Sequence, residues 1–288
     1  MRTVSQLITE EADRLLKGIK ELLGEENIHL TDLNANSEGI FHLGPHYAFP
    51  PLDDLEKKRL QSRLIDEHKR FFDLINTLLR EKVNSYELDA WTNTLRDIIE
   101  QRLVWQPTTD KVYEEAKTVM MKILESISYL YDPVEGAVIL IPDTNALIFS
   151  PAFHDWSFDG IEKFEILLIS TVLEELDRLK IEHRNPEVRD KAKRVIAQIK
   201  EYRRRGSLNE GVTVVKERVR LRSRATEPRV VETLPWLDPN SQDDRILASV
   251  IETMRTHVRS AVILVTSDIN LQNKAELARI PFLEPPSI

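Results

Sequence analysis

The sequence predicts an α/β protein: a three-layer α/β/α sandwich around a central parallel sheet, preceded by an all-helical N-terminal region. Two observations predict this fold. Before residue 134, apolar residues recur at helical spacing. After it, short and wholly apolar runs alternate with helical segments, as in βαβ units with helices on both faces of a sheet. A break rich in turn formers separates the two patterns, so we expect two domains, residues 1–134 and residues 135–288.

In the first domain, apolar positions between Val4 and Leu23 recur every three to four residues and predict a helix. Asp53 and Asp54 are suitable caps for a second, long helix that runs towards Leu79. Two further helices are expected around residues 86–104 and 109–129.

In the second domain, four short apolar runs have the composition of buried parallel strands. They are residues 137–141, 164–169, 212–215 and 261–265. Helical patterns follow in the segments between and after them, at residues 171–180, 186–204, 241–257 and 269–278.

Composition excludes several kinds of chemistry. The 288 residues carry a net charge of −8 and include no cysteine, which excludes disulfides, thiolate nucleophiles, zinc–thiolate sites and iron–sulfur clusters. A chain without cysteine fits the reducing cytoplasm. None of the eight glycines forms a dinucleotide-binding or P-loop motif. No apolar run approaches the roughly 20 residues that span a bilayer, so we expect no membrane partner.

One segment is strongly basic. Residues 178–229 hold 17 basic and 7 acidic residues, between two acidic flanks. Such a block is often only a solvated surface, but its density here also favours a polyanionic partner. The candidate RNA-binding residues are Arg203, Arg204, Arg205, Lys216, Arg218, Arg220, Arg222 and Arg224.

Acidic residues follow the predicted strands or open the helices after them. Asp143 follows the first strand and Asp268 the last, while Glu174 and Glu175, like Asp243 and Asp244, lie in the first turns of helices. Each fits a helix cap when taken singly. Taken together, carboxylates at one sheet edge repel by roughly 4 kcal/mol per pair at about 4 Å. A divalent cation relieves this repulsion, and an all-oxygen ligand set suits Mg²⁺ or Mn²⁺ and the hydrolysis of phosphodiesters.

Three sequence blocks resemble the signature of the PIN domain family of metal-dependent ribonucleases. They are I-P-D-T-N-A-L-I, V-L-E-E-L-D-R-L-K and L-V-T-S-D-I-N-L-Q-N-K-A, in the order in which the family has them. The resemblance covers about residues 137–284. It implies a PIN-like α/β/α sandwich whose acidic residues bind Mg²⁺ or Mn²⁺ and hydrolyse single-stranded RNA.

The resemblance assigns catalytic and metal-binding roles by position to four acids, Asp143, Glu175, Asp243 and Asp268. Glu174 is an alternative to Glu175, and Asp244 is interpreted as a solvated residue at a helix start. Four further residues are expected to orient the ligands: Thr144, Asn145, Ser267 and Asn270.

The expected function is therefore that of a Mg²⁺- or Mn²⁺-dependent endoribonuclease that acts on single-stranded RNA, with DNA as an open alternative. A second hypothesis is a catalytically inactive PIN-like module that binds RNA or protein. A phosphatase of the D-x-D-x-[TV] kind is disfavoured because Asn145 replaces its second aspartate. The role of residues 1–134 is open, with a protein regulator acting through them and homo-oligomerisation as further hypotheses.

Overall fold

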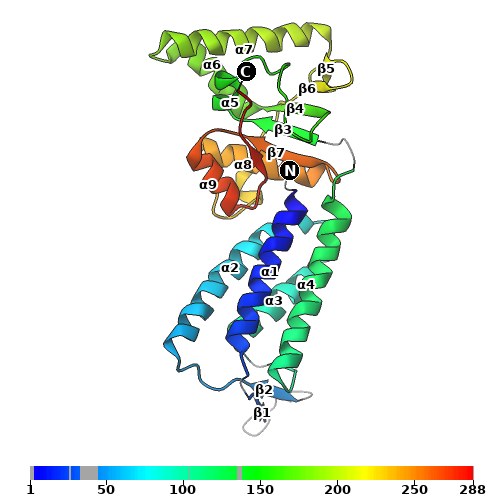
Figure 1. Ribbon diagram of the computed structural model, residues 1–288, viewed down its shortest axis with the longest axis vertical. Coiled ribbons are helices and arrows are strands. Elements are labelled where there is room, and N and C mark those ends of the chain that lie inside the picture. The colour runs from blue at the N-terminus through cyan, green and yellow to red at the C-terminus, as the bar shows by residue number, and fades with distance from the viewer. Residues whose placement is uncertain (1–2, 26, 33–44, 103, 135–137, 288) are drawn as a thin grey trace. The chain divides into compact units, whose positions relative to one another are not determined.

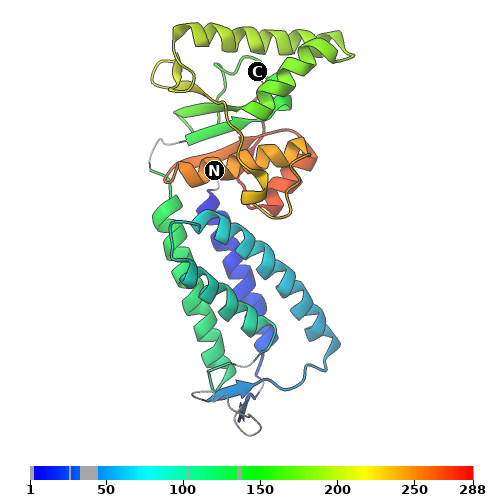
Figure 2. The ribbon, with the colours of Figure 1, turned by 180° about the vertical axis from the view of Figure 1, so that it is seen from behind.

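The computed structural model describes residues 3–25, 27–32, 45–102, 104–134 and 138–287. The chain divides into two compact units (Figures 1 and 2). The helical unit comprises residues 8–128, and the α/β unit comprises residues 129–288 together with residues 1–7. Residues 135–137, where the sequence predicts the second domain to begin, lie outside the described residues.

Helices dominate the helical unit, and the first and last of them extend into residues of the α/β unit. They are α1 (Val4–Leu23), α2 (Leu55–Leu79), α3 (Ser85–Ile99) and α4 (Thr109–Tyr131). The Asp54 side chain accepts a hydrogen bond from the Glu56 N–H (2.9 Å) and caps α2, as its sequence predicts. Over the ranges that the structure describes, no helix combines the length and the apolar composition of a bilayer-spanning segment.

A short antiparallel pair of strands, β1 (His29–Thr31) and β2 (His46–Ala48), also belongs to the helical unit. Tyr47 of β2 exchanges two backbone hydrogen bonds with Val104, at 2.8 and 2.9 Å. The sequence predicts no strand in this region, and the difference has a simple reason. A strand of three residues is too short to show an alternating pattern.

In the core of the helical unit, α1 and α2 approach closely at Gly18. Leu15 and Ile19 of α1 are buried, as is Leu64 of α2. A Cβ atom on residue 18 would lie 2.5 Å from Leu64 Cδ2, well inside the contact distance of two carbon atoms. The missing side chain of Gly18 therefore permits the close packing of these two helices.

His68 of α2 is buried against α3, with 6% of its surface exposed. Its Nε2 lies 3.1 Å from the carbonyl oxygen of Thr92, so this nitrogen carries a proton and donates it. Burial above all lowers the pKa of His68 from 6.5 to about 4, and the charge of Arg96 acts in the same direction. The hydrogen bond to Thr92 opposes this shift. The folded protein thus holds His68 in its neutral form.

We predict that His68 makes the protein less stable in mild acid. The unfolded chain protonates His68 as the pH falls below about 6.5, whereas the folded protein does so only near pH 4. The free energy of unfolding therefore keeps its full value above about pH 6.5. It falls with the pH below that value, by about 2 kcal/mol at pH 5. His68→Leu should flatten the pH dependence of the free energy of unfolding by that amount, as measured by urea titration. The same change at the exposed His29 is the control, and equal slopes for both variants would contradict the assignment.

The α/β unit is built around a sheet with the strand order β5-β6-β4-β3-β7-β8. The strands are β3 (Val138–Pro142), β4 (Phe164–Ile169), β5 (Val212–Val215), β6 (Val219–Arg224), β7 (Ala261–Val265) and β8 (Phe282–Leu283). β5 and β6 pair antiparallel at one edge, and all other neighbours pair in parallel. The four predicted strands are present, although Ala137 lies outside the described residues, and β6 and β8 add to them.

Helices cover both faces of this sheet. They are α5 (Thr144–Phe149), α6 (Ser170–Glu182), α7 (Pro186–Arg205), α8 (Gln242–Thr256) and α9 (Ile269–Leu277), with a 3₁₀ turn, η1, at Val230–Glu232. α5, α6 and α7 lie on one side of the sheet, and α8 and α9 lie on the other (Figures 1 and 2). The predicted three-layer α/β/α arrangement is therefore confirmed.

Candidate functional site

Asp143 and Asp268 follow neighbouring parallel strands at the same edge of the sheet. Pro142 of β3 lies opposite Val265 of β7, and the Asp143 N–H donates to the Val265 carbonyl oxygen at 3.0 Å. After β3 the chain continues into β4 on one side, and it returns much later through β7 on the other side. The strand order thus reverses between β3 and β7, which is where ligands bind in open α/β sheets.

The Asp143 carboxylate is 3% exposed and uses both of its oxygens in hydrogen bonds. Oδ1 accepts from the Ala146 N–H (2.6 Å) and caps α5, while Oδ2 accepts from the Thr266 hydroxyl (2.5 Å). The Thr266 oxygen in turn accepts from the Asp268 N–H (3.0 Å), so one hydroxyl connects the two acidic residues. Thr266 is not among the residues that the sequence pattern singles out. Its place directly after β7, opposite the residue that follows β3, is the signal that would have found it.

Burial and charge act together on Asp143. Burial above all raises the pKa of Asp143 to about 6, and the negative charges of Asp268 and Glu175 act in the same direction. The hydrogen bonds from Thr266 and Ala146 oppose this shift. Three of the four predicted acids, Asp143, Glu175 and Asp268, are therefore close enough to interact electrostatically.

Glu175 lies on α6 with 22% of its side chain exposed. Its Oε2 accepts a hydrogen bond from the Gln242 side chain at the start of α8, and its Oε1 lies 3.6 Å from the Arg178 guanidinium. The alternative acid, Glu174, is 64% exposed and pairs with Arg245 (3.1 Å). Because Glu175, and not Glu174, affects the pKa of Asp143, the geometry favours Glu175 as the site residue.

At the start of α8, Asp243 and Asp244 both pair with Lys274 of α9. The Lys274 ammonium lies 3.5 Å from Asp243 and 2.7 Å from Asp244. Asp244 is only 6% exposed and also accepts a hydrogen bond from the Asp238 N–H (3.0 Å). The interpretation of Asp244 as a solvated residue is therefore wrong. A sequence alone cannot distinguish two adjacent acids at a helix start, because both fit the capping pattern.

The residues of this edge fit a hard divalent cation in kind, because every ligating group is an oxygen and negative charge accumulates around Asp143. The structure does not bring the four acids into one cluster. Among the residues that it describes, no three histidine, aspartate or glutamate side chains are arranged to hold a metal ion. Asp143, Glu175 and Asp268 form one group, and Asp243 is separated from it by its pairing with Lys274.

The four predicted orienting residues differ in their surroundings. The Thr144 hydroxyl is buried beside Asp143 and finds no hydrogen-bond partner among the described residues. Asn145, Ser267 and Asn270 are exposed at the same edge. The backbone N–H of Asn270 donates to Asp268 Oδ1 (2.8 Å), which caps α9.

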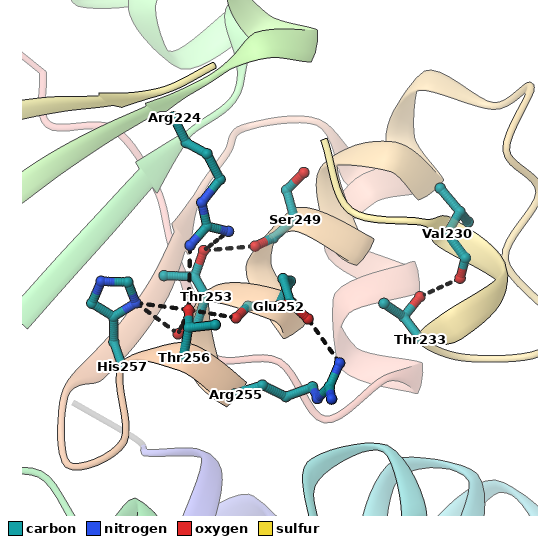
Figure 3. A network of polar contacts seen from close by, with 9 residues as sticks. All are labelled: Arg224, Val230, Thr233, Ser249, Glu252, Thr253, Arg255, Thr256 and His257. Atoms are coloured by element: carbon teal, nitrogen blue, oxygen red, sulfur yellow. Dashed lines mark hydrogen bonds and ion pairs between the residues drawn. The ribbon is translucent and has the colours of Figure 1, made fainter. Parts of the chain in front are cut away.

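The predicted RNA-binding arginines of β6 are largely occupied within the protein. Arg222 pairs with Glu165 of β4 (2.7 Å), and Arg220 lies 3.9 Å from the same carboxylate. Arg224 donates to the hydroxyls of Thr253 (3.2 Å) and Thr256 (3.3 Å) on α8 (Figure 3). Arg224 therefore connects the sheet to α8, and Arg220 and Arg222 neutralise the Glu165 carboxylate.

The remaining predicted RNA-binding residues lie outside this network. Arg218 donates to the carbonyl oxygens of His154 (2.9 Å) and Trp156 (3.3 Å) and so fixes a loop. Lys216 is exposed, 3.9 Å from Glu217. Arg203, Arg204 and Arg205 are all exposed in the last turn of α7.

The comparison with protein families agrees with this architecture. A family model described as PIN domain matches residues 140–284, about half of the chain. The matched residues run from β3 to the end of β8 and contain Asp143, Glu175, Asp243 and Asp268. A comparison with curated proteins found no match.

We predict that Lys274 stabilises the acidic start of α8. Lys274→Met leaves the buried Asp244 carboxylate without its cation, and we expect a loss of about 1 to 3 kcal/mol in the free energy of unfolding. Because Asp244→Asn removes the same pair, the double variant should be less destabilised than the sum of the two single variants. Urea titration of the four proteins measures this coupling, and strictly additive losses would contradict it.

Proposed function

Because the chain belongs to the PIN domain family, whose members are usually nucleases, we propose that it is a metal-dependent endoribonuclease acting on single-stranded RNA. PIN domains generally bind nucleic acids, mainly RNA, and use divalent metal ions. We assign the nuclease domain to residues 135–288. The absence of cysteine supports a cytoplasmic location. A protein regulator acting through residues 1–134 and homo-oligomerisation stay hypotheses.

One observation carries this proposal: Asp143 and Asp268 follow neighbouring parallel strands at the point where the strand order reverses. Burial above all raises the pKa of Asp143, and the charges of Asp268 and Glu175 act in the same direction, which supports a shared site for these acids. A cation at this edge would relieve that repulsion. The position also agrees with the general place of ligands in open α/β sheets.

We assign the metal to Asp143, Glu175 and Asp268, with Mg²⁺ or Mn²⁺ as the ions that suit an all-oxygen site. An ion held there would supply Lewis acidity to the phosphodiester and help to activate water. Thr266 orients the Asp143 carboxylate through its hydroxyl, and Gln242 orients Glu175 in the same way. Asp243 is assigned as a further ligand, one that would exchange its contact with Lys274 for the ion.

The pairing of Asp243 with Lys274 also supports a second candidate function. A lysine ammonium already neutralises the start of α8, and the described acids do not form a cluster of three. Both features fit a PIN-fold module that binds nucleic acid without cleaving it. Binding without cleavage under any divalent ion is the result expected from this candidate.

We predict that Asp143→Asn abolishes cleavage of single-stranded RNA. The amide keeps an oxygen to cap α5 but loses the negative charge that would hold the metal ion. Because this removes several kcal/mol of transition-state stabilisation, we expect the cleavage rate to fall about 100-fold or more. The measurement is cleavage of an end-labelled RNA by the full chain with Mn²⁺, with Mg²⁺ and with a chelator.

Asp190→Asn is the matched control for this experiment. Asp190 lies on α7 with 61% of its side chain exposed, where it pairs with Lys193, so its loss should leave the cleavage rate unchanged. Cleavage that persists both in Asp143→Asn and with the chelator would overturn the proposed metal site. A wild-type protein that binds RNA but never cleaves it would favour the second candidate.

A further inference from the structure

A groove of about 770 Å³ lies between α6, α7 and the end of β6. Four apolar residues contribute to its lining: Leu173, Ile196, Ile199 and Leu208. Smaller, polar and charged residues complete the lining, among them Lys200 and Arg203 of α7 and the ion pair of Asp177 with Lys180 on α6. A groove with apolar lining and cations at its side is suited to a ligand that combines flat apolar groups with anionic ones.

Lys200 and Arg203 are the cations in this groove that the fold does not use. They lie three residues apart on α7 and therefore on the same face of the helix. Both are exposed, and in the described ranges neither has a carboxylate within ion-pair distance. The neighbouring Arg204 differs, because it pairs with Glu201 (3.3 Å) and does not line the groove.

A series of contacts connects the end of the groove to the helix that carries Glu175. Ser223, Arg224 and Ala225 line its end, and two residues further on Glu227 accepts hydrogen bonds from Thr171 (2.5 Å) and Arg245 (2.6 and 2.9 Å). Arg245 also contacts Glu174, the neighbour of Glu175. The end of the groove is thus connected through Glu227 and Arg245 to the turn of α6 that carries Glu175.

We propose that this groove binds the phosphodiester backbone of a single strand beside the cleavage site. Lys200 and Arg203 contact phosphates, and the apolar lining lies against the face of a base. The inference rests on the proposed nuclease function, because that function supplies the strand. It also selects among the predicted basic residues: Arg203 contacts the strand, whereas Arg204 and the paired arginines of β6 do not.

The test is a binding titration of the full chain with a fluorescent single-stranded RNA in the presence of a chelator, which separates binding from cleavage. One variant combines Lys200→Gln and Arg203→Gln. The matched control is Arg204→Gln, on the same helix. The double variant should bind about tenfold more weakly at low salt, and the slope of log K against log salt should be shallower by about 1.4, or about 0.7 per lost phosphate contact. Arg204→Gln should leave both quantities unchanged.

A DNA strand of the same sequence forms a second arm, and equal effects on RNA and DNA would assign the contacts to phosphate rather than to the 2′-hydroxyl. Equal binding by the double variant and by Arg204→Gln would contradict the proposed role of the groove. A wild-type protein that binds neither strand would contradict it as well. Cleavage assays with Mn²⁺ keep the two proposals apart. Reduced binding by the double variant, with no cleavage by the wild type, would support the groove and reject the nuclease. Cleavage by the wild type, with unchanged binding by the double variant, would support the nuclease and reject the groove.

Discussion

The parallel pairing of β3 with β7 is the constraint on which the candidate site depends. It places Pro142 opposite Val265, and so sets the residues after the two strands, Asp143 and Thr266, side by side. The Thr266 hydroxyl then connects Asp143 with the backbone of Asp268. Both strands are almost wholly buried, and a shift of one residue in their register would separate the acids. The packing that stabilises the sheet and the geometry of the site are therefore the same feature.

The negative charge at this edge is balanced unequally. At the start of α8, Lys274 lies against Asp243 and Asp244, and Asp244 can be buried because it has this cation beside it. Around Asp143 the fold supplies hydrogen bonds but no cation within ion-pair distance among the described residues, and the pKa of Asp143 rises. The protein thus neutralises the start of α8 with its own lysine, whereas the buried Asp143 is held by hydrogen bonds alone.

Long elements with strong patterns could be predicted from the sequence, whereas features that depend on distant partners could not. The apolar runs of β3, β4 and β7 and the capped start of α2 carry their signal locally. β6 reads V-R-L-R-S-R, so its arginines suggested a nucleic-acid surface. Their partners lie about 30 to 55 residues away in sequence, on β4 and α8, where no local pattern shows them. The burial of Asp244 could not be predicted for the same reason, because the lysine that neutralises it lies on α9.

The division of the chain into units has a consequence for its synthesis on the ribosome. The helical unit is complete once residue 128 has been made, whereas the α/β unit draws on the first seven residues and on everything after residue 128. β7, which lies inside the sheet beside β3, is translated only after β4, β5 and β6. A nascent chain that stalls before residue 261 therefore holds Asp143 without its neighbour, and any activity that needs both acids arises only after β7 has been made.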